Sequence, residues 1–217
     1  MADSEKKLLA RLQHGLELLG LDITADQVES LLDYQALLVR WNQRFNLTAV
    51  REPEAMVVRH LLDSLAISKH ITGLSILDVG TGAGLPGLPL GIADEHRQIT
   101  LLDSNGKKTR FLSHVKQQLA LTNITVVQSR VENFRPDITF DAIVSRAFTR
   151  LENMVVTCRH LLAGGGRLFA MKSQSATEEI AAMGNAAKVI AIHPIKVPFL
   201  EEERVLIELQ LAAGEMP

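Results

Sequence analysis

Near residue 70 the spacing of apolar positions changes from helical intervals to short apolar runs that alternate with helical segments. Before it, apolar residues such as Val28, Leu31 and Leu38 recur mostly at helical intervals. Thr24 and Gln27 form the pattern of a capping box, and Pro53 suits the first turn of a helix. The predicted helices cover residues 4–19, 24–45 and 53–69. We therefore expect residues 1–70 to form a helical extension that caps a second unit.

From residue 74 onward, short apolar runs alternate with helical segments. The predicted strands are residues 75–79, 98–102, 124–128, 140–145, 167–171, 189–197 and 204–211. The predicted helices are residues 86–93, 107–119, 151–161 and 177–187. This alternation is typical of βαβ units in a doubly wound sheet. Only residues 198–203 separate the last two strands, which is too short for a crossover helix. The sequence predicts an α/β domain over residues 71–217 whose mostly parallel seven-stranded sheet ends in an antiparallel hairpin.

The densest chemical signal lies directly after the first predicted strand. That strand contains Asp78, and Gly80, Gly82 and Gly84 follow at alternate positions. Glycines at a strand-to-helix turn permit unusual backbone angles and a close approach of a ligand. Asp103 ends the second strand, where an acid commonly accepts hydrogen bonds from a ribose. These residues together predict a nucleoside pocket at the carboxyl edge of the sheet.

Composition narrows the classes of protein that fit this pattern. The 217 residues are 47% hydrophobic and 22% charged, with neither a signal-peptide pattern nor an apolar run of membrane-spanning length. A single cysteine, Cys158, excludes an internal disulfide and fits the reducing cytoplasm. The net charge is −2, but residues 97–172 hold 12 Lys/Arg against 5 Asp/Glu. That basic segment indicates either a surface for a polyanion or a set of solvated helix faces.

The glycine spacing differs from the dinucleotide fingerprint, whose third glycine comes two residues later. It resembles the first motif of class I S-adenosylmethionine-dependent methyltransferases, which are Rossmann-like. Further segments extend the resemblance to the bacterial ribosomal RNA small subunit methyltransferase G family over nearly the whole chain. They are Trp41-Asn42, residues 45–48, Arg59 to Ser64, Gly80 to Gly87, Leu101 to Ser104, Ser129 to Glu132 and Ser145 to Phe148.

This resemblance implies methylation of N7 of guanosine 527 in the 530 loop of 16S ribosomal RNA, with S-adenosylmethionine as the cofactor. It implies cofactor contacts by Gly80, Leu85, Val131 and Glu132, and it places Arg146 beside the methionine end. The resemblance to the glycine motif and the strand-tip argument add the remaining cofactor-binding candidates. These are Asp78, Gly82, Gly84 and Asp103.

Guanine N7 carries a free lone pair, so its methylation requires alignment and exclusion of water but no general base. We accordingly expect no catalytic acid or base. Arg146 is a positioning candidate at a strand tip, and Phe148 either stacks on an extruded base or packs in the core. No spacing of His, Cys, Asp or Glu suggests a metal.

Five cations are candidates for contacts with RNA phosphates. They are Arg59, Lys107, Lys108, Arg110 and Lys172. On a regular helix Arg59 and Asp63 share a face, which predicts an intrahelical ion pair. His60 fits a packed or exposed role better than a ligand role, and the acidic run 201–203 fits a solvated turn.

The expected partner is 16S ribosomal RNA, in the small ribosomal subunit or its precursor, and we expect a cytoplasmic monomer that does not bind membranes. Two other enzyme functions remain open at this point. The basic middle segment argues against a small-molecule methyltransferase, and the glycine spacing argues against a nucleotide-dependent oxidoreductase. A non-catalytic protein that binds the cofactor and associates with RNA is the third alternative, and cofactor binding without turnover would favour it.

Overall fold

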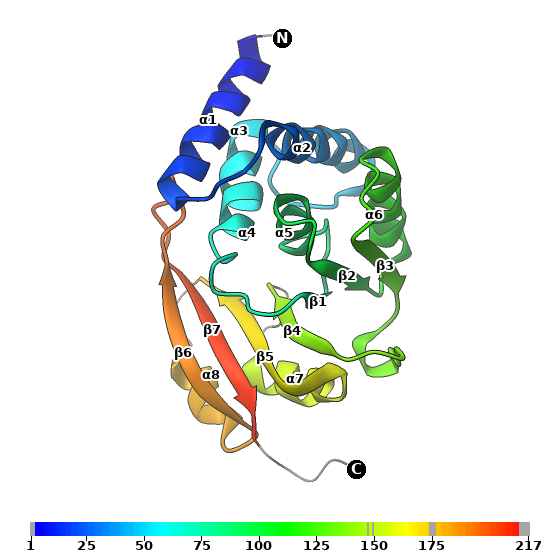
Figure 1. Ribbon diagram of the computed structural model, residues 1–217, viewed down its shortest axis with the longest axis vertical. Coiled ribbons are helices and arrows are strands. Elements are labelled where there is room, and N and C mark those ends of the chain that lie inside the picture. Colours follow the sequence, from blue (N-terminus) through cyan, green and yellow to red (C-terminus); the bar gives the residue numbers. More distant parts are fainter. Residues whose placement is uncertain (1–2, 147, 149, 174–176, 213–217) are drawn as a thin grey trace.

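The computed structural model describes residues 3–146, 148, 150–173 and 177–212. Its centre is a seven-stranded sheet in the order β3-β2-β1-β4-β5-β7-β6 (Figure 1). The strands are β1 (Ser75–Val79), β2 (Gln98–Asp103), β3 (Ile124–Gln128), β4 (Phe140–Ser145), β5 (Leu162–Lys172), β6 (Ala187–Ile195) and β7 (Arg204–Leu211). Strands β1 to β5 run parallel, and β7 runs antiparallel to both β5 and β6. The predicted α/β fold with a terminal hairpin is confirmed.

Helices cover both faces of this sheet (Figure 1). On one face lie α2 (Ala25–Phe45), α5 (Gly87–Ala93) and α6 (Gly106–Gln118), together with α1 (Asp3–Leu19), α3 (Pro53–Met56), η1 (Val57–Leu62) and α4 (Asp63–Leu65). On the other lie α7 (Leu151–Cys158), the 3₁₀ turn η3 (Arg159–Leu161) and α8 (Thr177–Met183). A further 3₁₀ turn, η2 (Val131–Asn133), follows β3.

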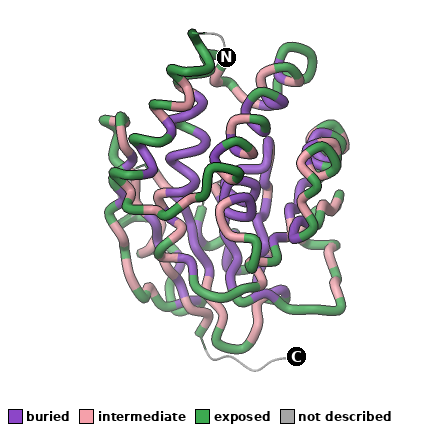
Figure 2. Tube along the Cα trace, turned by 45° about the horizontal axis from the view of Figure 1, so that its top comes forward, coloured by how far each residue is buried: buried purple, intermediate pink, exposed green. Residues whose placement is uncertain are grey.

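The N-terminal helices and the sheet share one hydrophobic core. Leu12 and Leu31 from the helices belong to the same buried cluster as Ile99 and Val144 from the strands. A second cluster, which includes Met154 of α7, fills the opposite face. In Figure 2 the buried segments run through the centre and the exposed ones surround them. The helical extension is therefore held against the sheet by burial of apolar surface.

Most predicted elements are confirmed, including the capping box of α2. The side chain of Thr24 accepts a hydrogen bond from the backbone N–H of Gln27, and the side chain of Gln27 accepts one from the backbone N–H of Thr24. The third predicted helix differs, because residues 57–62 form a π-helical turn and the helix ends at Leu65 rather than Lys69. Beyond Leu65 the chain turns so that Ile67 and Ile71 enter the core. Burial of these two side chains stabilises the turn more than continuing the helix to Lys69 would stabilise it.

Cys158 is fully buried, and burial raises the pKa of its thiol to about 12. It therefore packs as a small apolar residue, as the sequence indicated. Within the described residues, no helix has both the length and the apolar character needed to cross a bilayer.

Candidate functional site

The glycine loop, residues 80–87 between β1 and α5, is built on backbone angles that favour glycine. Gly80, Gly82 and Gly84 have φ values of +67°, +63° and +100°. A Cβ atom on Gly84 would lie 2.4 Å from a methyl carbon of Leu88. A Cβ on Gly82 would meet nothing closer than 3.9 Å. Gly84 is thus needed for packing inside the protein, whereas Gly82 leaves open space beside the chain.

Asp78 fixes the shape of the glycine loop through hydrogen bonds made inside the protein. It is fully buried, and its Oδ2 accepts hydrogen bonds from the Thr81 hydroxyl at 2.6 Å and the Gly87 N–H at 2.8 Å. Burial raises the pKa of Asp78 to about 6, and these two hydrogen bonds oppose the rise. Within the described residues its Oδ1 has no hydrogen-bond partner. A direct contact between Asp78 and a cofactor stays a prediction.

Asp103 brings the tip of β2 to the same loop. Its Oδ2 accepts a hydrogen bond from the Gly82 N–H at 2.9 Å, and its Oδ1 accepts one from the Asn105 N–H at 2.9 Å. Lys108 lies 3.4 Å from Oδ2. The structure therefore places Asp103 beside Gly82, as the strand-tip argument predicts. It also gives Lys108, a candidate for RNA contacts, a carboxylate partner inside the protein.

Tyr34 attaches the helical extension to the glycine loop. Its hydroxyl, on the buried face of α2, donates a hydrogen bond to the Ala83 carbonyl at 2.8 Å. Burial raises the pKa of Tyr34 well above its ordinary value, so the hydroxyl is a donor at physiological pH. The sequence analysis did not single out Tyr34, because no local pattern distinguishes it from a core residue.

A second group of side chains, the arginine cluster, comprises Arg59, Arg146 and Arg204, which line one cavity together with Asp63. Arg146 donates to Asp63 Oδ2 at 3.0 Å, and Arg204 Nε donates to Asp63 Oδ1 at 3.0 Å. The Asp63 side chain is only 6% exposed. One buried carboxylate therefore orients two guanidinium groups, from the end of β4 and the start of β7.

The predicted ion pair between Arg59 and Asp63 is wrong. The π-helical turn follows an i→i+5 pattern, so it rotates the two side chains away from the relation that a regular helix would give them. Arg59 instead pairs with Glu202 across 143 positions of sequence. Glu202 is therefore not only part of a solvated turn. Its pair with Arg59 holds the β6–β7 connection beside the arginine cluster.

His60 supports the arginine cluster from within. Its ring is buried, and Nε2 lies 2.9 Å from the Thr48 hydroxyl. Burial, helped by the charges of Arg146 and Arg59, lowers the pKa of His60 to about 4. The ring is therefore neutral near pH 7 and serves to hold the segment that carries Thr48.

A cavity of about 420 Å³ opens in front of the arginine cluster. Its lining includes Thr48, Arg59, Arg146, Phe148, Lys172 and Arg204. Phe148 is half-buried, and its ring packs against the core cluster under α7 while it lines this cavity. The size lies within the range of ligand pockets, and the side chains supply positive charge with one aromatic face. Ala147 and Thr149, its neighbours, lie outside the described residues.

Lys172 has a structural role in addition to lining the cavity. Its side chain is 12% exposed, and Nζ donates to the Phe148 carbonyl at 2.9 Å and to Glu179 at 2.8 Å. Glu179 also accepts a hydrogen bond from the Leu151 N–H at 3.0 Å. Lys172 and Glu179 therefore hold the segment around Phe148 onto β5 and α8. No pattern in the sequence indicates this role for Glu179.

The other predicted residues lie around the glycine loop. Lys107 and Arg110 are exposed on the first turns of α6 and remain available to an anion. Val131 is half-buried and Glu132 exposed on η2, the turn that follows β3 at the same edge of the sheet as Asp103. Leu85 is buried, 5% exposed, and is joined to Pro86 by a cis peptide bond. The parallel strands thus bring all the cofactor-binding candidates to one edge. Within the described residues, no group of three or more His, Cys, Asp or Glu could hold a metal ion.

Solved structures with similar folds include methyltransferases. A glycopeptide N-methyltransferase, MtfA, complexed with S-adenosyl-L-methionine aligns with a TM-score of 0.60 at 12% identity, covering 71% of this chain and 88% of that one. A putative methyltransferase from Thermoplasma acidophilum aligns with a TM-score of 0.51 at 15% identity, covering 66% and 70%. At these identities the likeness concerns the fold alone.

The sequence comparisons are closer. Residues 27–207 match the family model of rRNA small subunit methyltransferase G. A ribosomal RNA small subunit methyltransferase G from Pseudomonas paraeruginosa is 50% identical over 93% of this chain and 95% of its own length. A protein of the same name from Aeromonas salmonicida is 46% identical over 94% and 98%. The chain therefore belongs to the rRNA small subunit methyltransferase G family.

Proposed function

We propose that this protein transfers a methyl group from S-adenosylmethionine to N7 of guanosine 527, in the 530 loop of 16S ribosomal RNA. The observation that carries the proposal is the glycine loop joined to Asp103 in a chain that its family matches almost end to end. The basic cavity of the arginine cluster, at the same edge of the sheet, supplies a place for an RNA nucleotide.

The residues at the glycine loop fit the cofactor. Gly82 has open space where a side chain would otherwise stand, so its backbone permits a close ligand. The carboxylate of Asp103 is fixed by two backbone N–H groups and suits a ribose diol. We assign Gly80 and Leu85 to the same pocket, with Asp78 and Gly84 maintaining its shape. Val131 and Glu132 would flank the adenine.

When bound, S-adenosylmethionine supplies a methyl group activated by a positively charged sulfur. The acceptor nitrogen uses its own lone pair, so the protein contributes alignment and exclusion of water. Arg146 is fixed by Asp63 and faces the cavity, where it suits a carboxylate, a phosphate or guanine O6. A donor on N7 itself would block the acceptor. Phe148 would stack on the extruded base.

For the remaining RNA contacts we favour the exposed cations Lys107 and Arg110, and next Arg59, whose exposed pair with Glu202 a phosphate would replace. Lys108 and Lys172 already face Asp103 and Glu179, so phosphate contacts by these two would compete with internal pairs. We further propose that the protein acts in the cytoplasm as a monomer, on the small subunit or its precursor, and that residues 1–70 serve as an extension of the methyltransferase domain 71–217.

The test is methyl transfer from labelled S-adenosylmethionine to small subunits and to 16S RNA from a strain that lacks this gene. We expect label in 7-methylguanosine at one position of the 530 loop. An Arg146→Ala variant should bind S-adenosylmethionine and methylate at least tenfold more slowly. Absence of label in any RNA form, with cofactor binding intact, would contradict the function. Methylation at the normal rate by Arg146→Ala would remove the role of that residue.

A further inference from the structure

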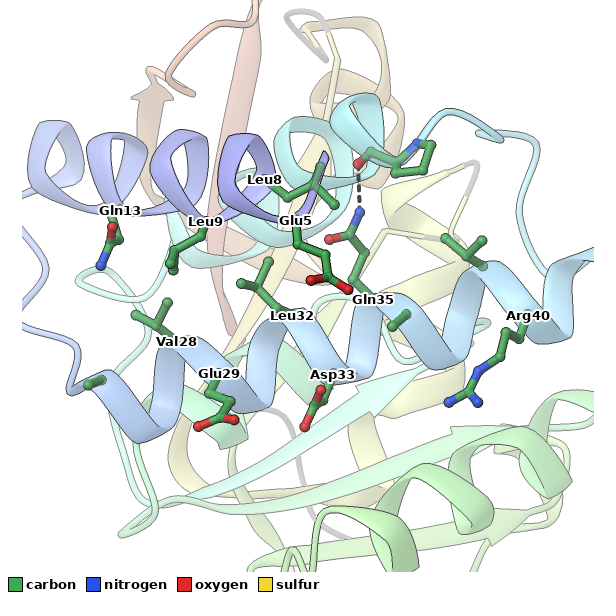
Figure 3. A pocket seen from close by; sticks show the side chains of 14 residues that line it. Glu5, Leu8, Leu9, Gln13, Val28, Glu29, Leu32, Asp33, Gln35 and Arg40 are labelled. Carbon is green, nitrogen blue, oxygen red and sulfur yellow. Dashed lines mark hydrogen bonds between the residues drawn. The ribbon is translucent and has the colours of Figure 1, made fainter. Parts of the chain in front are cut away.

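A groove of about 740 Å³ lies away from the glycine loop and the arginine cluster, between α1 and α2 (Figure 3). Its floor is apolar and is formed by Leu8 and Leu9 of α1 with Val28, Leu32 and Val39 of α2. All but Val28 are only partly buried, so apolar surface stays in contact with water. Apolar side chains that stay in contact with water and line a groove between polar rims are a feature of interaction sites.

The groove follows α2 over most of the length of that helix. On α2 its lining extends from Ala25 to Arg40, which corresponds to about 24 Å of helix axis. Part of one wall is fixed where Gln35 donates a hydrogen bond to the Pro53 carbonyl at 2.6 Å. An occupant of matching length is a helix of about four turns, and a compact small molecule would leave most of the apolar floor exposed.

The charged side chains that line the groove are net negative, because three of them are carboxylates and one is a guanidinium group: Glu5, Glu29, Asp33 and Arg40. Glu29 and Asp33 are exposed on α2 beside the apolar floor, and neither forms a salt bridge with any described residue. Residues 1–96 as a whole hold 13 Asp/Glu against 8 Lys/Arg. These carboxylates repel RNA phosphates and attract lysine and arginine side chains. The charge therefore favours a protein segment over the RNA itself.

We propose that this groove binds a basic amphipathic helix from a protein component of the small ribosomal subunit. The apolar face of that helix packs on Leu32 and Val39, and its cations face Glu29 and Asp33. The inference rests on the proposed function, which brings this protein to the small subunit. It adds a docking surface on the face that the cofactor and the methylated base do not use.

Photo-crosslinking tests the partner directly. The photoreactive amino acid p-benzoylphenylalanine is placed at Ala36, which lines the groove, or at Gln43, an exposed control position on α2 outside it. Each protein is irradiated with purified, unmethylated small subunits. We expect position 36 to form an adduct that resists ribonuclease and contains a segment rich in Lys and Arg with helical apolar spacing. Position 43 should not form it.

Three results would overturn the inference while the protein still co-sediments with the subunit. They are an adduct at position 36 with 16S RNA alone, an adduct with a second copy of this chain, and equal yields from both positions. No adduct at position 36 under the same conditions would overturn it as well. Loss of co-sedimentation with no methylation would instead contradict the proposed function, and the inference with it.

A charge substitution gives a second readout. Ala36→Arg fills the groove and places a cation beside Asp33, so we expect the affinity for small subunits to fall about tenfold in a co-sedimentation assay. Gln43→Arg adds the same side chain outside the groove and should leave the affinity unchanged. Both positions are exposed, and matching thermal unfolding curves would verify that both variants are folded. Equal affinities of the two variants would contradict the docking surface.

Discussion

The glycine loop and the arginine cluster lie at the same edge of the sheet and are assembled in different ways. The glycine loop is nearly continuous in sequence, and Asp78 binds both of its ends through Thr81 and Gly87. The arginine cluster brings Arg146 and Arg204 together around Asp63. In the sequence Asp63 lies 83 positions before Arg146 and 141 positions before Arg204. The first region is determined by local backbone geometry, and the second by long-range charge pairing.

The two kinds of assembly suit the two kinds of ligand that the proposed function requires, a cofactor and an RNA nucleotide. A cofactor common to many enzymes is held by backbone atoms and a strand-tip acid, which a short motif encodes. Under the proposed function, the RNA nucleotide is held by side chains directed into a cavity of positive charge. The side chains that line this cavity come from η1, β4 and β7, and Asp63 of the helical extension pairs with Arg146 and Arg204. The following substitutions separate the two regions.

The largest effect is expected for Gly84→Ala in the glycine loop. The new Cβ would lie 2.4 Å from Leu88 and 2.9 Å from Leu112, at a φ of +100°. Overpacking and backbone strain together should lower the free energy of unfolding by about 3 kcal/mol. Urea denaturation measures this loss, and calorimetry should show S-adenosylmethionine affinity lower by more than tenfold. Gly164→Ala, with nothing within 4 Å, is the neutral control. Equal stability of the two variants would contradict this view of the loop.

Next comes the pH dependence of Asp78. Its pKa in the folded protein is raised from 3.8 to about 6, so folding favours the protonated carboxyl. The contribution of Asp78 to stability is therefore largest below pH 4 and is lost as pH rises through 6, an effect of about 3 kcal/mol. Relative to Asp78→Asn, the wild-type protein should become more stable as pH falls from 7.5 to 4. Denaturation curves across this range measure the difference, and parallel pH profiles would disprove it.

In the arginine cluster, Asp63→Asn removes the shared charge while keeping the shape of the side chain. A buried carboxylate that serves two guanidinium groups should cost about 2 kcal/mol of stability when neutralised, because both cations lose their partner. We expect the methylation rate to fall about tenfold and S-adenosylmethionine affinity to change less than twofold. Glu202→Gln, which breaks an exposed pair with Arg59, should have a small effect. If Asp63→Asn lowered S-adenosylmethionine affinity as much as the methylation rate, the glycine loop and the arginine cluster would act as one unit, which would contradict the comparison.

The smallest expected effect belongs to Tyr34→Phe, which tests the link between the helical extension and the glycine loop. Loss of the hydroxyl leaves the Ala83 carbonyl without this donor and should cost about 1 kcal/mol. S-adenosylmethionine affinity should weaken about threefold while the rate at saturating cofactor stays near that of the wild type. A lower rate with unchanged affinity would show that α2 acts on the arginine cluster instead.

The sequence predicts the fold well because apolar periodicity and turn residues are local signals. The strand ranges of β1, β3, β4 and β7 agree with the structure at both ends. The helix through His60 is the clear exception, because a π-helical turn has no local signature and its rotation depends on which partners Asp63 and Arg59 meet. The pairs Lys172–Glu179 and Arg59–Glu202 were missed for the same reason.

By itself the sequence predicted that Asp78, the three glycines and Asp103 meet at one edge of the sheet, because parallel strands bring their carboxyl ends together there, and the structure has them in contact. Only the tertiary structure decided which cations face the cavity and which are paired within the protein. It also showed the groove between α1 and α2, since neither helix reveals in sequence how much of its apolar face the other covers. Charge pairing and helix packing depend on contacts between distant residues, and a linear pattern contains no record of those distances.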